Sequence, residues 1–179
     1  MEKIKLVHEV RAVKTKKELD SIIKAQRISE RVLSDVLNKL KTHAKAGQVG
    51  ITELEIANFI KKSFIKYKAP ILSFPPIVAF GKNTANIHHI PGNSKLKKGD
   101  FVMFDFGTTI NHYCSDMTRT YIYGTPSPKQ KKVYEAVLRS QELALSKLRK
   151  GEKKANNIDK VSRNFLHKKF KVLRILLKD

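Results

Sequence analysis

Two aspartates, Asp105 and Asp116, are candidates for chemistry because both lie in strand-like sequence. The segments FVMFDFGTT (101–109) and YCSDMTRTYIY (113–123) are rich in β-branched and aromatic residues. A short polar break separates them, and this pattern predicts a β-hairpin. With the turn centred on residues 110 and 111, Asp105 lies directly opposite Asp116 on the same face, with Cβ atoms about 5 Å apart.

Two facing carboxylates need an explanation, because like charges in that position destabilise a sheet. A bound divalent cation would remove the repulsion, since hard metal ions take carboxylate oxygens as ligands and one carboxylate can bridge two ions. The alternative is a solvated strand edge, because a register shift of one residue would send the two side chains to opposite faces. The spacing alone leaves both interpretations open.

A pair of histidines, His88 and His89, lies in the loop GKNTANIHHIPGNSKLKKGD (81–100) that precedes the hairpin. Adjacent residues of an extended chain point to opposite sides, so at most one histidine can face the aspartates. The alternative is that both are ordinary polar loop residues. For Cys114, on the second strand of the hairpin, we expect a small buried thiol rather than a ligand.

Capping motifs predict where the surrounding helices begin. TKKE (15–18) and TELE (52–55) are capping boxes ahead of amphipathic stretches, and SPKQ (127–130) caps a third helix with proline in its first turn. We expect these helices to end near Gly47, at Ala69–Pro70 and near Arg149, with a fourth helix beginning within residues 156–159 and a strand at Ile77–Phe80. This order indicates an α+β domain.

The composition is that of a globular protein with a strong charge imbalance. The chain has 179 residues, 37 Lys and Arg against 16 Asp and Glu, and a net charge of +21. Only 8 of the basic residues are arginines, and the lysines are spread over the predicted helices, so we expect no specific nucleic-acid site. Tight binding to one nucleic-acid sequence that survives ~200 mM salt would contradict this expectation.

The amino-terminal segment has scattered charges and no apolar core, which argues against a signal peptide. No apolar run approaches the roughly 20 residues of a membrane span, so we expect no membrane partner. One cysteine excludes an internal disulfide. These features predict a cytoplasmic protein.

Five stretches, taken together and in order, resemble the pita-bread metallopeptidases of peptidase family M24. They are KTKKELDSIIKAQRIS, GITELEIANFIKK, SFPPIVAFGKNTANIHHIPG, KLKKGDFVMFDFGT and HYCSDMTRTYIYGTPSPKQKKVYEAV. The family includes methionine aminopeptidases, Xaa-Pro aminopeptidases and Xaa-Pro dipeptidases. The segments SFPPIVAFG and CSDMTRT and the HH pair before Pro91 are more similar to the Xaa-Pro branch.

The resemblance implies a pita-bread fold truncated to its first α/β half, with a β-hairpin and amphipathic helices. We expect residues 1–14 to be a linker, 15–170 the N-terminal half of the catalytic domain and 171–179 a tail unrelated to the family. The amino-terminal domain of Xaa-Pro members and the second catalytic half are expected to be absent.

The resemblance also implies site residues. Asp105 and Asp116 match the first two ligands of a two-metal centre, with Mn²⁺ or Co²⁺ as the expected ions. His88 matches the catalytic histidine that contacts the substrate near the scissile carbonyl, and counting back from Gly99–Asp100 selects it over His89. The remaining ligands, one histidine and two glutamates, belong to the family's second half. We therefore expect weak or no metal binding by this chain alone.

The expected function is that of a metal-dependent aminopeptidase-type hydrolase acting on peptides with an N-terminal Xaa-Pro, with this chain inactive on its own. The alternatives are a methionine aminopeptidase, a non-catalytic binding module of the same fold, and one half of a split enzyme. The expected partners are a complementary C-terminal half or a second copy, because half a sheet leaves an edge that can pair with another chain.

Overall fold

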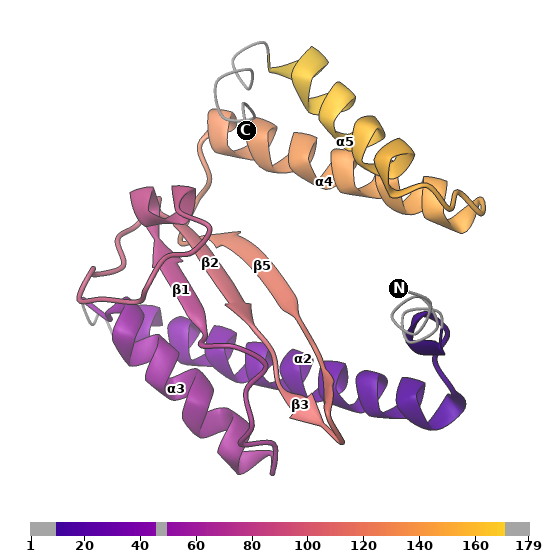
Figure 1. Cartoon of the computed structure of the whole chain (residues 1–179). Coiled ribbons are helices and arrows are strands. Elements are labelled where there is room, and N and C mark those ends of the chain that lie inside the picture. Colours follow the sequence, from indigo (N-terminus) through magenta and orange to yellow (C-terminus); the bar gives the residue numbers. More distant parts are fainter. Residues whose placement is uncertain (1–9, 46–49, 171–179) are drawn as a thin grey trace. The chain divides into compact units, whose positions relative to one another are not determined.

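The computed structural model describes residues 10–45 and 50–170 (Figure 1). The chain forms two compact units, Met1–Thr125 and Pro126–Asp179, and each is described by itself. The order of elements is the one that the sequence predicts. No helix in the described part combines the length and the apolar character that a bilayer crossing requires.

Two long helices of the first unit begin at the predicted capping boxes. Helix α2 spans Lys16–Lys45, and the Thr15 amide donates to the Glu18 carboxylate over 2.5 Å. Helix α3 spans Glu53–Lys66, and its capping residue Thr52 exchanges bonds of 2.7 and 3.2 Å with Glu55. The predicted helix end at Gly47 lies outside the described residues.

A three-stranded antiparallel sheet lies beside these helices in the order β1-β2-β5 (Figure 1). The strands are β1 (Ile77–Phe80), β2 (Phe101–Phe106) and β5 (Met117–Ile122). Alternate side chains of β2 are buried, as a strand with one covered face requires. They join one apolar core with α2 and α3, and its members include Val32, Val36, Ile56, Ile60, Phe64, Val78, Phe80, Val102, Phe104 and Phe106.

The predicted hairpin forms, but its turn lies one residue further along than expected. Short strands β3 (Thr109–Ile110) and β4 (Tyr113–Cys114) flank a two-residue turn of Asn111 and His112, with φ angles of +49° and +69°. Positive φ at both central positions is the geometry whose twist suits a tight hairpin. The ladder consequently pairs Asp105 with Thr118, so the prediction that Asp105 lies directly opposite Asp116 is wrong.

The backbone of the hairpin comes very close to itself at Gly107 and Ser115, between the β2–β5 ladder and the β3–β4 ladder, and this close approach is called the crossing below. The Ser115 hydroxyl accepts from the Thr108 amide at 3.0 Å and lies 2.9 Å from the Ser29 hydroxyl of α2. A Cβ on Gly107 would lie 1.9 Å from the Ser115 carbonyl oxygen, so only glycine fits at this position. The crossing fixes the backbone immediately before Asp116.

The second unit is a pair of helices, α4 (Pro128–Arg149) and α5 (Ala155–Lys169). Helix α4 begins at the predicted Ser127 cap, with Pro128 in its first turn, and ends where the sequence predicts. Ser140 and Ser162 join the helices through reciprocal hydroxyl-to-carbonyl bonds of 3.2 and 3.0 Å. The unit contains none of the predicted site residues.

Candidate metal centre

Asp105 and Asp116 lie close together although they are not directly opposite. Asp105 is on β2 and Asp116 immediately precedes β5, two positions before Thr118, the ladder partner of Asp105. A shift of two residues preserves the face of a strand, so Asp116 becomes a diagonal neighbour of Asp105. Both carboxylates line the same cavity.

The Asp105 carboxylate lies in a setting that is unfavourable for a charge. Its Oδ1 atom is buried and has no hydrogen-bond partner among the described residues. Burial, together with the nearby Asp116 carboxylate, raises the pKa of Asp105, and a hydrogen bond from Thr118 acts in the opposite direction. An orphaned carboxylate oxygen beside a second carboxylate is a site that a divalent cation would stabilise.

The cavity in front of the two aspartates has a volume of about 550 Å³. The histidine loop and the proline-containing segment before β1 form its other walls. Its lining therefore combines two carboxylates and two imidazoles with apolar side chains, which are Phe74, Pro75, Pro76, Ile77, Ile87, Ile90 and Pro91. A cavity with few polar groups among apolar walls is typical of a substrate site.

The two histidines have different surroundings. The imidazole Nε2 of His89 lies 2.8 Å from the Glu53 carboxylate, and the His89 side chain is only 16% exposed. His88 is exposed, and its backbone amide donates to the Asn86 side chain over 3.1 Å. Both side chains line the cavity of the two aspartates, so the expectation that at most one histidine can face them is not confirmed, and the catalytic role of His88 stays a prediction.

Cys114 and His112 lie at the far end of the hairpin. Cys114 is exposed, with its Sγ 3.3 Å from the Thr109 hydroxyl, so the prediction of a buried thiol is wrong. The shifted turn explains the difference, because it is Ser115, the next residue, that turns into the interior. His112 is an exposed turn residue.

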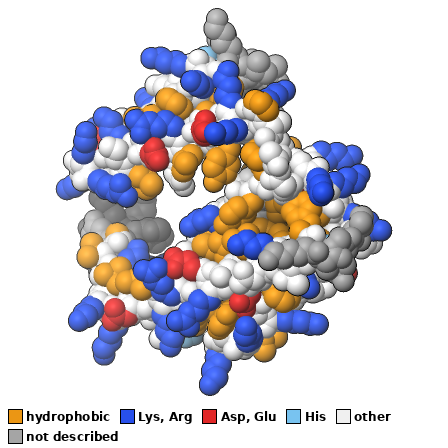
Figure 2. All heavy atoms as spheres, turned by 180° about the vertical axis from the view of Figure 1, so that it is seen from behind, with side chains coloured by type: hydrophobic (Ala, Val, Ile, Leu, Met, Phe, Trp, Pro, Cys, Tyr) orange, Lys and Arg blue, Asp and Glu red, His pale blue; other side chains and the backbone are white. Residues whose placement is uncertain are grey.

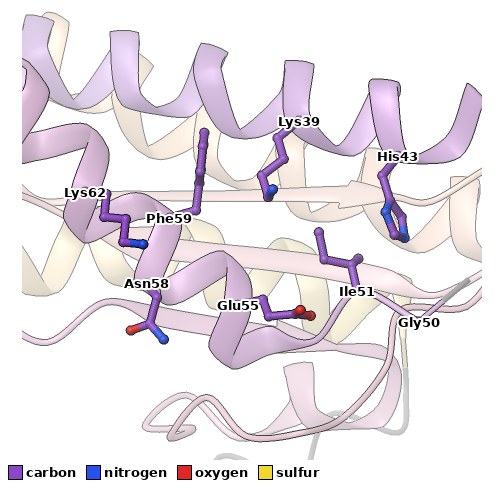
Figure 3. Close-up of a pocket in the computed structure, with 8 residues that line it drawn as sticks. All are labelled: Lys39, His43, Gly50, Ile51, Glu55, Asn58, Phe59 and Lys62. Carbon is purple, nitrogen blue, oxygen red and sulfur yellow. The ribbon is translucent and has the colours of Figure 1, made fainter. Parts of the chain in front are cut away.

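A second hollow, of about 700 Å³, lies between α2 and α3 (Figure 3). Two of its polar groups contact neighbours: the Glu55 carboxylate binds the Thr52 cap, and the Lys39 ammonium lies 5.0 Å from the centre of the Phe59 ring. The hollow contains neither predicted ligand. Its chemistry is that of a solvated helix surface.

The distribution of the basic side chains bears on nucleic-acid binding. On the face shown in Figure 2, Lys and Arg are distributed over the visible surface among apolar and polar neighbours. Nucleic-acid recognition generally needs a concentrated basic stripe or patch. The absence of a specific nucleic-acid site nevertheless stays a prediction.

We predict that Asp105→Asn raises the melting temperature of the metal-free protein at neutral pH. A group whose pKa is raised in the folded state supports stability fully below its ordinary pKa of 3.8, and that support is lost as pH rises through the folded value. Asparagine keeps the shape but never ionises. A rise of roughly 2–4 °C would correspond to about 1 kcal/mol for a chain of this size.

Calorimetry in a chelator, at neutral pH and near pH 3, measures this effect. The difference between wild type and Asp105→Asn should shrink at the lower pH, where Asp105 is protonated in both folded and unfolded protein. A variant that melts lower than wild type at neutral pH would contradict the assigned environment of this carboxylate.

Comparison with known proteins identifies the family. The sequence matches metallopeptidase family M24 over residues 20–176. The chain belongs to this family. It is 35% identical over 160 residues to an uncharacterized peptidase of Staphylococcus haemolyticus and 32% identical over 163 residues to one of Staphylococcus aureus USA300, with 89% and 91% of this chain covered. It spans 43% and 44% of those relatives, less than half their length.

Solved structures show the same relationship. The M24 chain matches an Xaa-Pro dipeptidase from Bacillus anthracis with a TM-score of 0.80 and 30% identity, over 92% of this chain and 44% of that one. It matches a prolidase from Thermococcus sibiricus with a TM-score of 0.77 and 37% identity, over 90% and 42%. The predicted fold, the first half of the pita-bread architecture, is confirmed.

Family M24 is generally dependent on two metal ions, and the donor set of this chain fits part of such a centre. Asp105 and Asp116 offer adjacent carboxylate oxygens, one of them buried and unpaired. Within residues 10–45 and 50–170, no group of three or more His, Cys, Asp or Glu side chains could hold a metal ion. The described residues therefore offer two neighbouring carboxylates, and the role of Asp105 and Asp116 as metal ligands stays a prediction.

One residue of structural importance, Glu53, escaped the sequence analysis. Its side chain is fully buried and contacts the histidine loop. A signal was present, because Glu53 lies three and four residues before Ile56 and Ala57 and so falls on the apolar stripe of its helix. A carboxylate at such a position must find hydrogen-bond donors inside the protein.

Proposed function

We propose that this M24 chain carries the first half of a two-metal aminopeptidase-type site that hydrolyses peptides with an N-terminal Xaa-Pro. The observation that carries the proposal is the pair Asp105 and Asp116. Their carboxylates line one cavity, and the buried Oδ1 of Asp105 has no hydrogen-bond partner among the described residues. Bound divalent metal would supply an activated water and a clamp for the tetrahedral transition state. The ion is proposed to be Mn²⁺ or Co²⁺, which such oxygen ligands accept.

His88 is the proposed contact to the substrate near the scissile carbonyl. Its imidazole is exposed in the loop that lines the cavity, whereas His89 is bound to Glu53. An imidazole beside the reacting carbonyl can hold or donate a proton as charge develops on the oxygen. The apolar walls around it, including Phe74 and Pro76, would accept a proline ring by burying its carbons.

The similarity to solved Xaa-Pro peptidases favours the Xaa-Pro activity over that of a methionine aminopeptidase. Solved relatives named Xaa-Pro dipeptidase, prolidase and X-Pro aminopeptidase share 30–37% identity with this chain. The paired aspartates also speak against a purely non-catalytic module, because an unpaired carboxylate in this position costs stability unless it serves a ligand. A cytoplasmic location remains part of the proposal.

The test is a titration of isotope-labelled protein with Mn²⁺, a paramagnetic ion that broadens nearby resonances, followed by addition of an Xaa-Pro dipeptide. Broadening should centre on Asp105, Asp116 and Thr118 and disappear in Asp105→Asn. The dipeptide should shift the His88 ring signals more than a matched Xaa-Ala dipeptide does. Equal shifts for both dipeptides would refute the Xaa-Pro preference, and broadening that persists in Asp105→Asn would refute the metal assignment.

A further inference from the structure

Glu53, the first residue of α3, has a fully buried side chain with four hydrogen-bond partners. Its Oε1 accepts from the Phe80 amide and the Asn83 side chain, both over 2.8 Å. Its Oε2 lies 2.8 Å from Nε2 of His89 and accepts from the Gly92 amide over 3.2 Å. All four acceptor positions of the carboxylate are therefore used.

The bonding pattern identifies Glu53 as an ionised carboxylate. The Phe80 and Gly92 amides and the Asn83 NH₂ group can only donate, and they leave at most the contact with His89 for a carboxyl proton. Burial, the largest single influence, raises the pKa of Glu53, but the hydrogen bonds from Asn83, His89, Phe80 and Gly92 together lower it below its ordinary value. It follows that His89 carries its proton on Nε2 and donates to Glu53.

The four donors belong to one continuous stretch, residues 80–92, and they lie on both sides of His88 in the sequence. Phe80 is the last residue of β1, Asn83 lies in the 3₁₀ turn Gly81–Ala85, and His89 and Gly92 follow His88 in the chain. The backbone of α3 adds further bonds to the same loop, from Glu53 N to Ser94 O and from Leu54 N to Gly92 O, at 3.2 and 2.9 Å. The loop is thus fastened to the start of α3.

We propose that Glu53 is a positioning residue that fixes the histidine loop so that His88 points into the cavity of Asp105 and Asp116. His89 is the anchor: its imidazole is bound to Glu53, while the side chain of the preceding residue, His88, is exposed and lines the cavity of the two aspartates. The role of Glu53 as a positioning residue for catalysis rests on the proposed function, whereas the effect of Glu53 on the order of the loop does not.

The experiment compares Glu53→Gln with Glu55→Gln in the full chain. Glutamine keeps the size of the side chain but replaces one acceptor with a donor. Glu55 is a matched control in the same helical turn, and its carboxylate accepts from the amide and hydroxyl of the Thr52 cap instead of from the histidine loop. In Glu53→Gln, amide exchange at Phe80 and Gly92 should accelerate about ten-fold relative to wild type, as expected when a charged hydrogen-bond acceptor is lost. Glu55→Gln should leave both amides unchanged.

The position of His88 needs its own readout. Side-chain couplings of His88 should report one χ1 rotamer in wild type and averaging in Glu53→Gln, and Mn²⁺ should broaden the His88 ring less in the variant while Thr118 is broadened equally. Because His89 acts as a donor, His89→Gln should preserve the wild-type behaviour and His89→Phe should abolish it. Averaged couplings in wild type, or unchanged couplings in Glu53→Gln, would overturn the proposal.

Failure of the proposed function gives a different pattern. If Mn²⁺ leaves Thr118 unbroadened in wild type, the metal site is refuted, while amide exchange and the His88 couplings, which need no metal, still decide whether Glu53 orders the loop. If Thr118 is broadened but the His88 ring responds identically in wild type and Glu53→Gln, the metal site stands and the positioning role is refuted.

Discussion

The 179-residue chain, supplied with Mn²⁺ or Co²⁺, is expected to hydrolyse an Xaa-Pro peptide no faster than its Asp105→Ala variant. Two ions carry four positive charges, and the described residues offer them only the carboxylates of Asp105 and Asp116. Catalysis by a metal pair requires both ions to be held in place, with the nucleophilic water oriented between them. Loss of most ligands should therefore cost several orders of magnitude, on the order of the ~10²–10³ per group that a single oriented donor contributes.

Activity should return when the missing ligands are supplied in trans. The complement is the carboxyl-terminal part of the Staphylococcus haemolyticus peptidase that lies beyond its match to this chain. Strand β5 is at one edge of the described sheet, which gives the complement a place to pair. Turnover that requires both pieces, prefers Xaa-Pro and is lost in Asp105→Ala would support the account. Metal-dependent turnover by the chain alone would contradict it.

Gly107→Ala should destabilise the first unit by at least about 3 kcal/mol, a loss of roughly 6–12 °C in melting temperature for a chain of this size. The new Cβ would lie 1.9 Å from the carbonyl oxygen and 2.7 Å from the carbonyl carbon of Ser115. These are backbone atoms, so no side-chain rotation relieves the overlap. The hairpin strands would have to separate where Ser115 bonds Ser29 and Thr108, and Asp116 would move away from Asp105.

Gly92→Ala is the matched control, because a Cβ there would meet nothing within 4 Å. Its melting temperature should stay within about 2 °C of wild type, since an alanine at a compatible position changes stability by well under 1 kcal/mol. A Gly107→Ala variant as stable as Gly92→Ala would show that the crossing of the hairpin strands is not as the structure describes.

Local signals in the sequence were sufficient for most of the fold. The capping boxes at Thr15, Thr52 and Ser127 each begin a helix. In each box, side chains no more than three residues apart bind the free amides of the first helical turn. Strand β1 begins at Ile77, directly after two prolines that cannot donate to a ladder. These features depend only on neighbours in the chain, and so they could be predicted.

The hairpin register could not be predicted from the same kind of pattern. Its turn uses Asn111 and His112 at positive φ, a conformation that few non-glycine residues adopt, although Asn and His are among those that do so most often. A shift of the turn by one position moved the ladder partner of Asp105 from Asp116 to Thr118, yet left both aspartates on one face. The aspartate pair was therefore predictable as a pair, while its geometry depended on long-range packing.

The surroundings of the candidate site were the least predictable part. Glu53 and His89 are 36 positions apart, and only the packing of α3 under the histidine loop brings them together. Cys114 is exposed, and its neighbour Ser115 is buried, because the turn lies one residue further along than expected. Buried polar contacts between distant segments leave little trace in local composition, apart from a charged residue on an apolar helix stripe.

The central claim is that Asp105 and Asp116 are metal ligands, although two carboxylates alone should hold an ion only weakly, so that an excess of metal is needed to see it. Its most direct measurement is a crystal structure of the chain soaked in Mn²⁺, with an anomalous difference map recorded beside that of Asp105→Asn. The account predicts a manganese peak bridging the two carboxylates in the wild-type chain and none in the variant. A peak only elsewhere on the protein, or one that remains at this position in Asp105→Asn, would contradict it.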